Sequence, residues 1–143
     1  MTRSFIALGL VLGIAAGPAA AQESEVEAGR SEYLSACAGC HGRDAKGDGP
    51  MADLLSIETP DLTKLTERAG GAFPFRNTLL IIDGRNDVRA HGGDMPVWGD
   101  RYMTSMTRAQ DELRPPRWPE DPELLVRGRL LSLVYYLETI QEE

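Results

Sequence analysis

The stretch "SACAGCHGRDAKGDGP", residues 35–50, contains both cysteines of the chain and one of its two histidines. Cys37 and Cys40 are separated by two residues, and His41 follows directly. Cys-x-x-Cys-His is the motif of covalent c-type haem attachment. Two thiols one helical turn apart reach the two vinyl groups of a porphyrin, and the histidine behind them ligates the iron. The motif therefore predicts one haem c, joined by thioethers to Cys37 and Cys40, with His41 as an axial iron ligand.

Three other uses of a Cys-x-x-Cys pair compete with haem attachment. Outside the cytoplasm two cysteines usually form a disulfide. A thioredoxin-like redox pair accompanies a βαβ pattern, which the sequence around Cys37 does not show. A structural zinc ion takes four protein ligands, and among cysteines and histidines the chain offers Cys37, Cys40, His41 and His91. Because Cys40 and His41 are adjacent, they fit one tetrahedral ion poorly, and haem attachment is the favoured interpretation.

The N-terminal segment has the pattern of a secretory signal. Arg3 precedes an uncharged apolar run at residues 5–17, and small residues at 19–21 fit a cleavage site. The run is short for a membrane span, and no stop-transfer segment follows it. A retained N-terminal anchor is the alternative. We predict that residues 1–21 are a cleaved signal peptide and that residues 22–143 form one periplasmic domain without an integral membrane anchor.

The charge balance restricts the class of partner. The chain of 143 residues contains 15 lysines and arginines against 22 aspartates and glutamates, a formal net charge of −7. Loss of Arg3 with the signal makes the mature domain more negative still. This balance argues against nucleic acid and anionic membrane surfaces as partners. It favours a redox donor and acceptor with a basic docking patch, with a solvated acidic surface as the ordinary alternative.

Over most of its mature length the sequence resembles the single-haem class I cytochromes c of bacteria. The resemblance implies an all-α cytochrome c fold, with about four to five helices wrapped around one covalently bound haem, and one-electron transfer as the activity. Haem attachment after export agrees with the signal peptide. The segments that carry the resemblance are "GRSEYLSACAGCHG", "KGDGPMADLL", "TPDLTKL", "DMPVWGD" and "LLSLVYYLETI".

The same resemblance implies the second iron ligand. "MPVWG", after a glycine-rich loop, is similar to the segment that carries this ligand in the family, which identifies Met95. Pro96 restricts the backbone directly after it, and Trp98 is placed to shield the haem edge. A methionine that only fills the core is the alternative. His91 is the runner-up ligand and would give a bis-histidine haem; Met103 and Met106 are further rivals.

The two terminal segments are expected to be helices that cross. In residues 26–40, apolar and small residues recur at three- and four-residue steps on one face. The C-terminal helix is expected to begin near Pro122, with Asp121 as its N-cap. Its apolar stripe consists of Val126, Leu130, Leu133, Val134, Leu137 and Ile140. The crossing implied by the family brings Gly29 and Tyr33 against Gly128, Leu131 and Tyr135.

Proline and glycine divide the middle of the chain. Thr59 and Pro60 predict the cap and first residue of a helix that stops at Gly70. A second helix, with a buried strand as the alternative, is expected to end at Gly84. Residues 84–99 read as a loop, and the second half of the polar stretch 100–122 is expected to be extended because of its prolines. That stretch either docks a partner, covers the haem or is an inert surface loop.

These residues predict an electron carrier that is not itself an enzyme. Ligation by His41 and Met95 leaves no open iron position, so ligands do not change on oxidation or reduction. The first alternative is a tightly bound haem subunit of a larger periplasmic oxidoreductase. The second, a catalytic or gas-sensing haem protein, requires an open position at the iron. Three arginines are candidates to neutralise the haem carboxylates, with surface solvation as the default: Arg76, Arg85 and Arg89.

Overall fold

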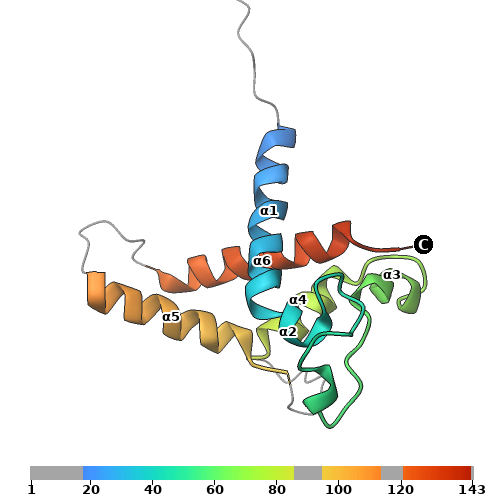
Figure 1. Ribbon diagram of the computed structural model, residues 1–143. Helices are drawn as coiled ribbons and strands as arrows, with labels where there is room; N and C mark the ends of the chain where they lie inside the picture. Colours follow the sequence, from blue (N-terminus) through green and yellow to red (C-terminus); the bar gives the residue numbers. More distant parts are fainter. Residues whose placement is uncertain (1–17, 86–94, 114–120, 143) are drawn as a thin grey trace, which may run out of the picture.

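The computed structural model describes residues 18–85, 95–113 and 121–142, which form helices joined by loops, with no strand among them (Figure 1). The α-helices are α1 (Pro18–Ala36), α2 (Ala38–His41), α3 (Leu65–Arg68), α4 (Phe75–Asp83), α5 (Trp98–Leu113) and α6 (Pro122–Thr139), and the 3-10 helices are η1 (Ala52–Leu54) and η2 (Leu62–Lys64). The predicted all-α class is confirmed. The described residues contain six α-helices rather than four to five, because two are single turns and the polar stretch contributes α5. No described helix is both long and apolar enough to cross a membrane.

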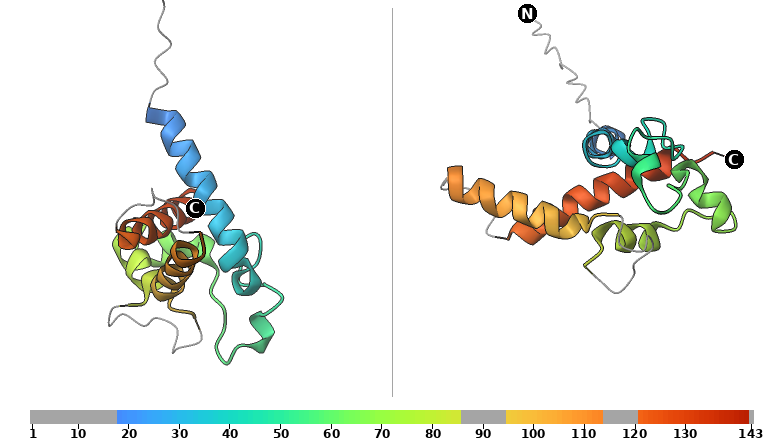
Figure 2. Two further views of the ribbon diagram at one scale, coloured as in Figure 1. Left: turned by 90° about the vertical axis from the view of Figure 1, so that its left-hand side faces the viewer. Right: turned by 60° about the horizontal axis from the view of Figure 1, so that its bottom comes forward.

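Helix α6 lies at the centre of the arrangement and contacts α1, α4 and α5 (Figures 1 and 2). Its predicted start is confirmed: Pro122 is the first residue, and the Asp121 side chain accepts a hydrogen bond from the Glu123 backbone N–H at 2.9 Å. This cap satisfies one of the backbone donors that a helix N-terminus leaves unpaired. The buried side chains of α6 are Val126, Leu130, Leu133, Val134, Tyr136 and Leu137.

Helix α1 crosses α6 at very close range, as Figure 1 shows. A Cβ atom at Gly29 would collide with the carbonyl oxygen of Ser132. Tyr33 is fully buried, and its ring centroid lies 5.4 Å from that of Tyr136. The close crossing is therefore confirmed, but Ser132 and Tyr136 replace the expected Leu131 and Tyr135. Gly128 is exposed and has no neighbour within 4 Å of a built Cβ.

The row of α6 residues that faces α1 differs from the expected one because α6 is apolar on more than one side. Adjacent residues point about 100° apart on a helix, so two neighbouring rows of apolar side chains are both compatible with its sequence. The row containing Tyr135 faces α4 instead, where its ring centroid lies 5.0 Å from that of Phe75. Across the α1–α6 crossing, the Arg129 guanidinium pairs with both carboxylate oxygens of Glu32 at 2.8 and 2.9 Å.

Helix α4 ends where expected, and the strand alternative for its apolar run is wrong. Gly84 follows the helix in a left-handed conformation with φ of 66°, and its N–H donates to the Leu80 carbonyl oxygen at 3.1 Å. Glycine adopts this conformation without the strain that a Cβ atom introduces. The chain is thereby turned away from the helix axis at residue 84.

The helix predicted from Thr59 and Pro60 begins later than expected. Asp61, rather than Thr59, is the cap: its carboxylate accepts from the Thr63 backbone N–H at 2.8 Å. The Pro60 carbonyl oxygen lies 3.2 Å from Nδ1 of His41 and is engaged there. In a helix beginning at Pro60, this carbonyl would point along the helix axis toward the backbone N–H of residue 64, whereas here it is directed at His41. Gly70, with φ of 83°, follows the end of α3 as predicted.

The first part of the polar stretch is helix α5, which also includes the last two residues of the expected 84–99 loop. Figure 1 shows α5 running beside the N-terminal part of α6, away from α2 and α3. Tyr102 is 4% exposed, and Met103 and Met106 are partly buried against the core. Both methionines thus have a packing role. The prolines of the second half, Pro115, Pro116 and Pro119, lie outside the described residues.

Candidate functional site

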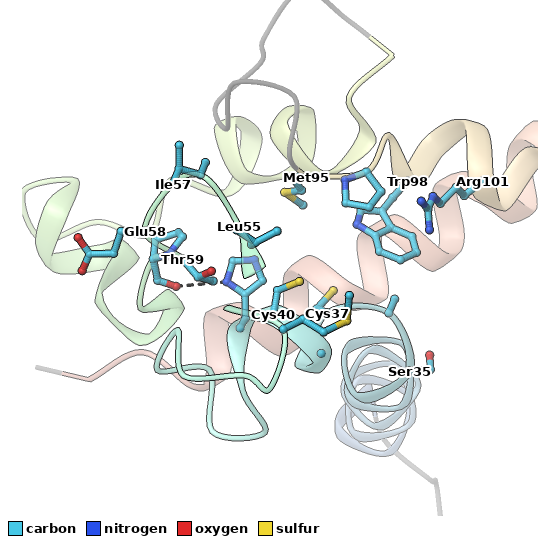
Figure 3. A pocket seen from close by; sticks show the side chains of 16 residues that line it. Ser35, Cys37, Cys40, Leu55, Ile57, Glu58, Thr59, Met95, Trp98 and Arg101 are labelled. Carbon is cyan, nitrogen blue, oxygen red and sulfur yellow. Dashed lines mark hydrogen bonds between the residues drawn. The ribbon is translucent and has the colours of Figure 1, made fainter. Parts of the chain in front are cut away.

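The attachment motif forms a tight turn between α1 and α2. Cys37 is the N-cap residue of α2, and its carbonyl oxygen accepts from the backbone N–H groups of Cys40 and His41 at 3.1 and 2.9 Å. Figure 3 shows the sulfur atoms of Cys37 and Cys40 together on one side of a pocket, with Met95 across from them. Local backbone hydrogen bonds thus bring both sulfurs to the same cavity.

The glycine-rich loop after the motif closes back onto α2. The carbonyl oxygens of Gly39, Cys40 and His41 accept from the N–H groups of Met51, Gly49 and Gly47 at 2.8, 2.9 and 2.8 Å. These carbonyls end a one-turn helix and have no partner within it. A Cβ atom at Gly49 would lie 2.5 Å from the Cys40 carbonyl oxygen, so the approach requires glycine. The "KGDG" sequence therefore serves to hold the attachment turn.

The imidazole of His41 is held in one orientation. The side chain is 7% exposed, and its Nδ1 lies 3.2 Å from the Pro60 carbonyl oxygen. A carbonyl only accepts hydrogen bonds, so this contact requires Nδ1 to carry the proton. The lone pair then belongs to Nε2, which is the atom a metal ion binds when the other nitrogen donates to a carbonyl. The structure thus prepares His41 as a ligand.

Two adjoining cavities lie against the motif. The larger has a volume of about 470 Å³ and the smaller of about 200 Å³, and both are lined by Cys37, His41, Pro60 and Met95. Trp98 lines the larger cavity, and the buried Leu137 lines the smaller one. Cofactor pockets in proteins span roughly 300–1,000 Å³, so the combined space fits a large organic cofactor.

One buried hydroxyl tests whether a haem fits here. Thr59 lines the larger cavity, and its Oγ1 is buried without a hydrogen-bond partner among the described residues. Buried polar atoms in folded proteins nearly always have such a partner. A haem carries two carboxylates, either of which accepts from a hydroxyl. The orphaned Oγ1, the two thiols and the ligand-ready His41 together fit this group.

The environment of Cys37 disfavours the competing interpretations of the motif. Burial raises the pKa of the Cys37 thiol to about 12, with smaller contributions in the same direction from Glu32 and Cys40. A redox-active thiol pair depends on a lowered pKa, because the thiolate is the reactive form. Among the described residues, no group of three or more histidine, cysteine or carboxylate side chains is placed to hold a metal ion. The redox-pair and zinc alternatives both lose support.

The candidate residues come together only in part. Cys37, Cys40, His41 and Met95 all line the larger cavity. His91, the runner-up ligand, lies outside the described residues. Met51 also lines the larger cavity but is 51% exposed. Of the three arginines considered for the haem carboxylates, Arg89 lies outside the described residues, Arg76 is exposed, and Arg85 is paired with Asp83 and Glu123.

Sequence reasoning missed several residues of the cavity wall, among them Arg101 and Thr59. Arg101 lines the larger cavity, with its guanidinium 5.2 Å from the centre of the Trp98 ring. Its signal was present, since Trp98, Tyr102 and Met106 recur at four-residue steps and predict the helix that positions Arg101. Thr59 was interpreted as a helix cap. No sequence signal distinguished that role from a hydroxyl facing a cofactor.

Comparison with known proteins identifies the family. The sequence profile described as Cytochrome c matches residues 26–113, which is more than half of the chain and includes Cys37, Cys40, His41 and Met95. The chain belongs to the cytochrome c family, and it is accordingly a haem-c electron-transfer protein with covalently bound haem. The matched residues end before α6.

One similarity to a curated protein carries no functional argument. The chain is 28% identical over 107 residues to the probable outer membrane protein PmpD of Chlamydia trachomatis serovar D. The similarity covers 75% of this chain but only 7% of that protein. No solved structure matches the chain.

Proposed function

We propose that the chain is a periplasmic electron carrier with a single haem c held six-coordinate between His41 and Met95. The observation that supports this most is the position of Met95, which lines both cavities together with His41. Figure 3 shows it across the pocket from the two cysteines. Like Met103 and Met106, Met95 is partly buried against the core, but it also lines both cavities beside His41, which core filling alone does not explain.

Each residue of the site has a distinct task in this function. Cys37 and Cys40 anchor the cofactor, and His41 is held by Pro60 in the tautomer that binds iron. Met95 is followed by Pro96, which restricts the backbone, and by the first turn of α5. When bound, the haem accepts and releases one electron, and a methionine sulfur favours its ferrous form. If His41 and Met95 both held the iron, no position would be left open for a catalytic or gas-sensing role.

The ligand assignment is tested by spectra and redox titrations of the parent, Met95→Ala and Met95→His. We expect a low-spin parent of relatively high potential, a Met95→Ala variant that binds carbon monoxide readily in the ferrous state, and a lower potential for Met95→His. An unchanged spectrum in Met95→Ala would transfer the role to His91 or another methionine. Carbon monoxide binding by the parent protein would instead favour the catalytic or sensing class.

Export and partner choice are tested separately. Protein purified from the native host is expected to begin at Gln22, and a retained residue 1 would support the anchored alternative. Co-purification of a second chain at fixed stoichiometry would identify a permanent subunit of a larger oxidoreductase. Both measurements leave the ligand assignment untouched.

The surface beside the cavity supports a protein partner. Met51, Leu54 and Ile57 are 51%, 79% and 39% exposed, and two of them, Met51 and Ile57, line the larger cavity. Asp53 and Glu58 flank these apolar side chains along the chain. An apolar surface with acidic neighbours suits a partner with a basic rim. Electron-transfer rates with such a partner should fall as salt concentration rises, and salt-independent rates would contradict this match.

A further inference from the structure

An ion-pair cluster joins the end of α4 to the beginning of α6. Arg85 donates through Nη1 and Nη2 to the two carboxylate oxygens of Glu123 at 2.7 and 3.0 Å. On its other side it donates through Nε and Nη2 to the two oxygens of Asp83, the latter bond at 3.2 Å. Asp83, Arg85 and Glu123 are called the Arg85 clasp below. Both carboxylates are bound in the paired geometry that a planar guanidinium allows.

The clasp differs from an ordinary surface ion pair. The side chains of Asp83, Arg85 and Glu123 are only 23%, 24% and 29% exposed. Arg85, with help from Arg127, lowers the pKa of the Glu123 carboxyl to about 2, so this carboxylate stays ionised at neutral pH. Exposed ion pairs contribute little to stability, whereas bidentate and partly buried ion pairs hold their geometry better. The clasp is therefore able to fix the segments that it joins.

The clasp packs directly on the chain that carries Met95. A Cβ atom at Gly99 would collide with Asp83 Oδ1 and Arg85 Nε, so both side chains lie on the backbone of the first turn of α5. One residue before Arg85, a Cβ at Gly84 would lie 3.3 Å from the Val97 Cα. Residues 84–85 and 97–99 are thus pressed together, and Met95 stands two residues before this contact.

We infer that Arg85 is a positioning residue for Met95: through Asp83 and Glu123 it holds residues 97–99 in place and so keeps the thioether at the cavity. This inference rests on the proposed role of Met95 as an axial ligand. A thioether is a weak iron ligand. The fraction of time that it is bound therefore depends on how closely the chain holds the sulfur near the iron, as for any tethered group. Loss of Arg85 would also leave two carboxylates without the cation between them.

The inference is tested with imidazole, which binds ferric haem in the place of a displaced axial ligand. Apparent imidazole affinity is measured on ferric holoprotein of the parent, Met95→Ala, Arg85→Gln, Arg85→Lys, Glu123→Gln and Arg127→Gln. Arg127 is the matched control, because its Nε also bonds Glu123, at 3.1 Å, but its side chain is 70% exposed. Arg85→Gln is expected to bind imidazole about tenfold more tightly than the parent, a difference of about 1.4 kcal/mol, because the chain before α5 loses its support.

The other variants separate positioning from general destabilisation. Arg85→Lys keeps the positive charge but not the planar guanidinium that binds two carboxylates, so an intermediate imidazole affinity is expected. The imidazole affinity of Arg127→Gln should stay within about twofold of that of the parent. If Arg85→Gln does not accumulate as holoprotein, Glu123→Gln opens the clasp from the α6 side and should show the same tightening. Equal imidazole affinity in the parent and in the opened clasp, with much tighter binding in Met95→Ala, would overturn the inference alone. Unchanged affinity in Met95→Ala would overturn both the inference and the proposed ligand.

Discussion

The side of the cavity that carries His41 and the side that carries Met95 are built in different ways. On the His41 side, the attachment turn is held by backbone hydrogen bonds from residues no more than about a dozen positions away, together with the single contact to Pro60. On the Met95 side, the chain is held by side chains from α4 and by Glu123 of α6, far along the sequence. The difference shows that the position of His41 depends on local backbone geometry, whereas that of Met95 depends on long-range tertiary contacts.

The largest expected effect is the loss of covalent haem attachment on the His41 side of the cavity. In Cys37→Ala/Cys40→Ala, both anchoring sulfurs are absent, so no covalent haem should remain after extraction with acidified acetone. The check is the absorption of the protein pellet against that of the extract. Met51→Ala is a suitable control, because it alters the cavity wall but no anchor. Pigment that stays with the double variant would refute the attachment motif.

The next largest effect is expected from disrupting the crossing of α1 and α6. Gly29→Val places a branched side chain against the Ser132 carbonyl, and we expect a loss of about 2–4 kcal/mol in the free energy of unfolding. Gly128→Ala is the matched control, since its Cβ meets open space; it should stabilise by about 0.5–1 kcal/mol. Urea unfolding of the holoprotein measures both. Equal effects at the two glycines would show that the crossing is not close.

A smaller effect is expected from removing the hydroxyl of Thr59, which lines the same cavity as His41. If Thr59 Oγ1 donates to a haem carboxylate, Thr59→Val removes a hydrogen bond and lowers holoprotein stability by about 1 kcal/mol. If the hydroxyl stays unpaired, the same change removes a buried polar atom and stabilises the protein. The sign of the change in the urea midpoint therefore decides whether the Thr59 hydroxyl is hydrogen-bonded in the holoprotein. Thr78→Val is a useful reference, because its hydroxyl already donates to the Pro74 carbonyl oxygen at 3.0 Å.

The smallest expected effect is a pH dependence on the Met95 side. The folded pKa of Glu123, about 2, lies below its ordinary value of 4.5, so its ion pairs stabilise the fold above about pH 4.5. This contribution is lost as pH falls from 4.5 toward 2, because the unfolded chain takes up the proton first. With solvent screening we expect about 1 kcal/mol. Glu123→Gln should lack this portion of the pH profile, and a profile identical to the parent would contradict the assignment.

Much of the fold followed from local signals, because these signals act within a few residues. The end of α4 at Gly84 and the start of α6 at Pro122 each depend on one turn of backbone, so composition sufficed. Helix α5 was missed because its residues are mostly polar, although Trp98, Tyr102 and Met106 mark one face. The start of the helix after Pro60 was misplaced because the Pro60 carbonyl is directed at His41, nineteen residues away, rather than along a helix axis.

The sequence by itself predicted the haem attachment motif, since the reach of two thiols and an imidazole is set by spacing within one helical turn. It also determined the helical class and the close approach at Gly29. Only the tertiary structure decided which row of α6 faces α1, that Thr59 points at the cavity, and that Arg85 joins α4 to α6 beside Met95. Such choices depend on how whole helices pack, because several rows or partners satisfy the local sequence equally well and burial selects one among them.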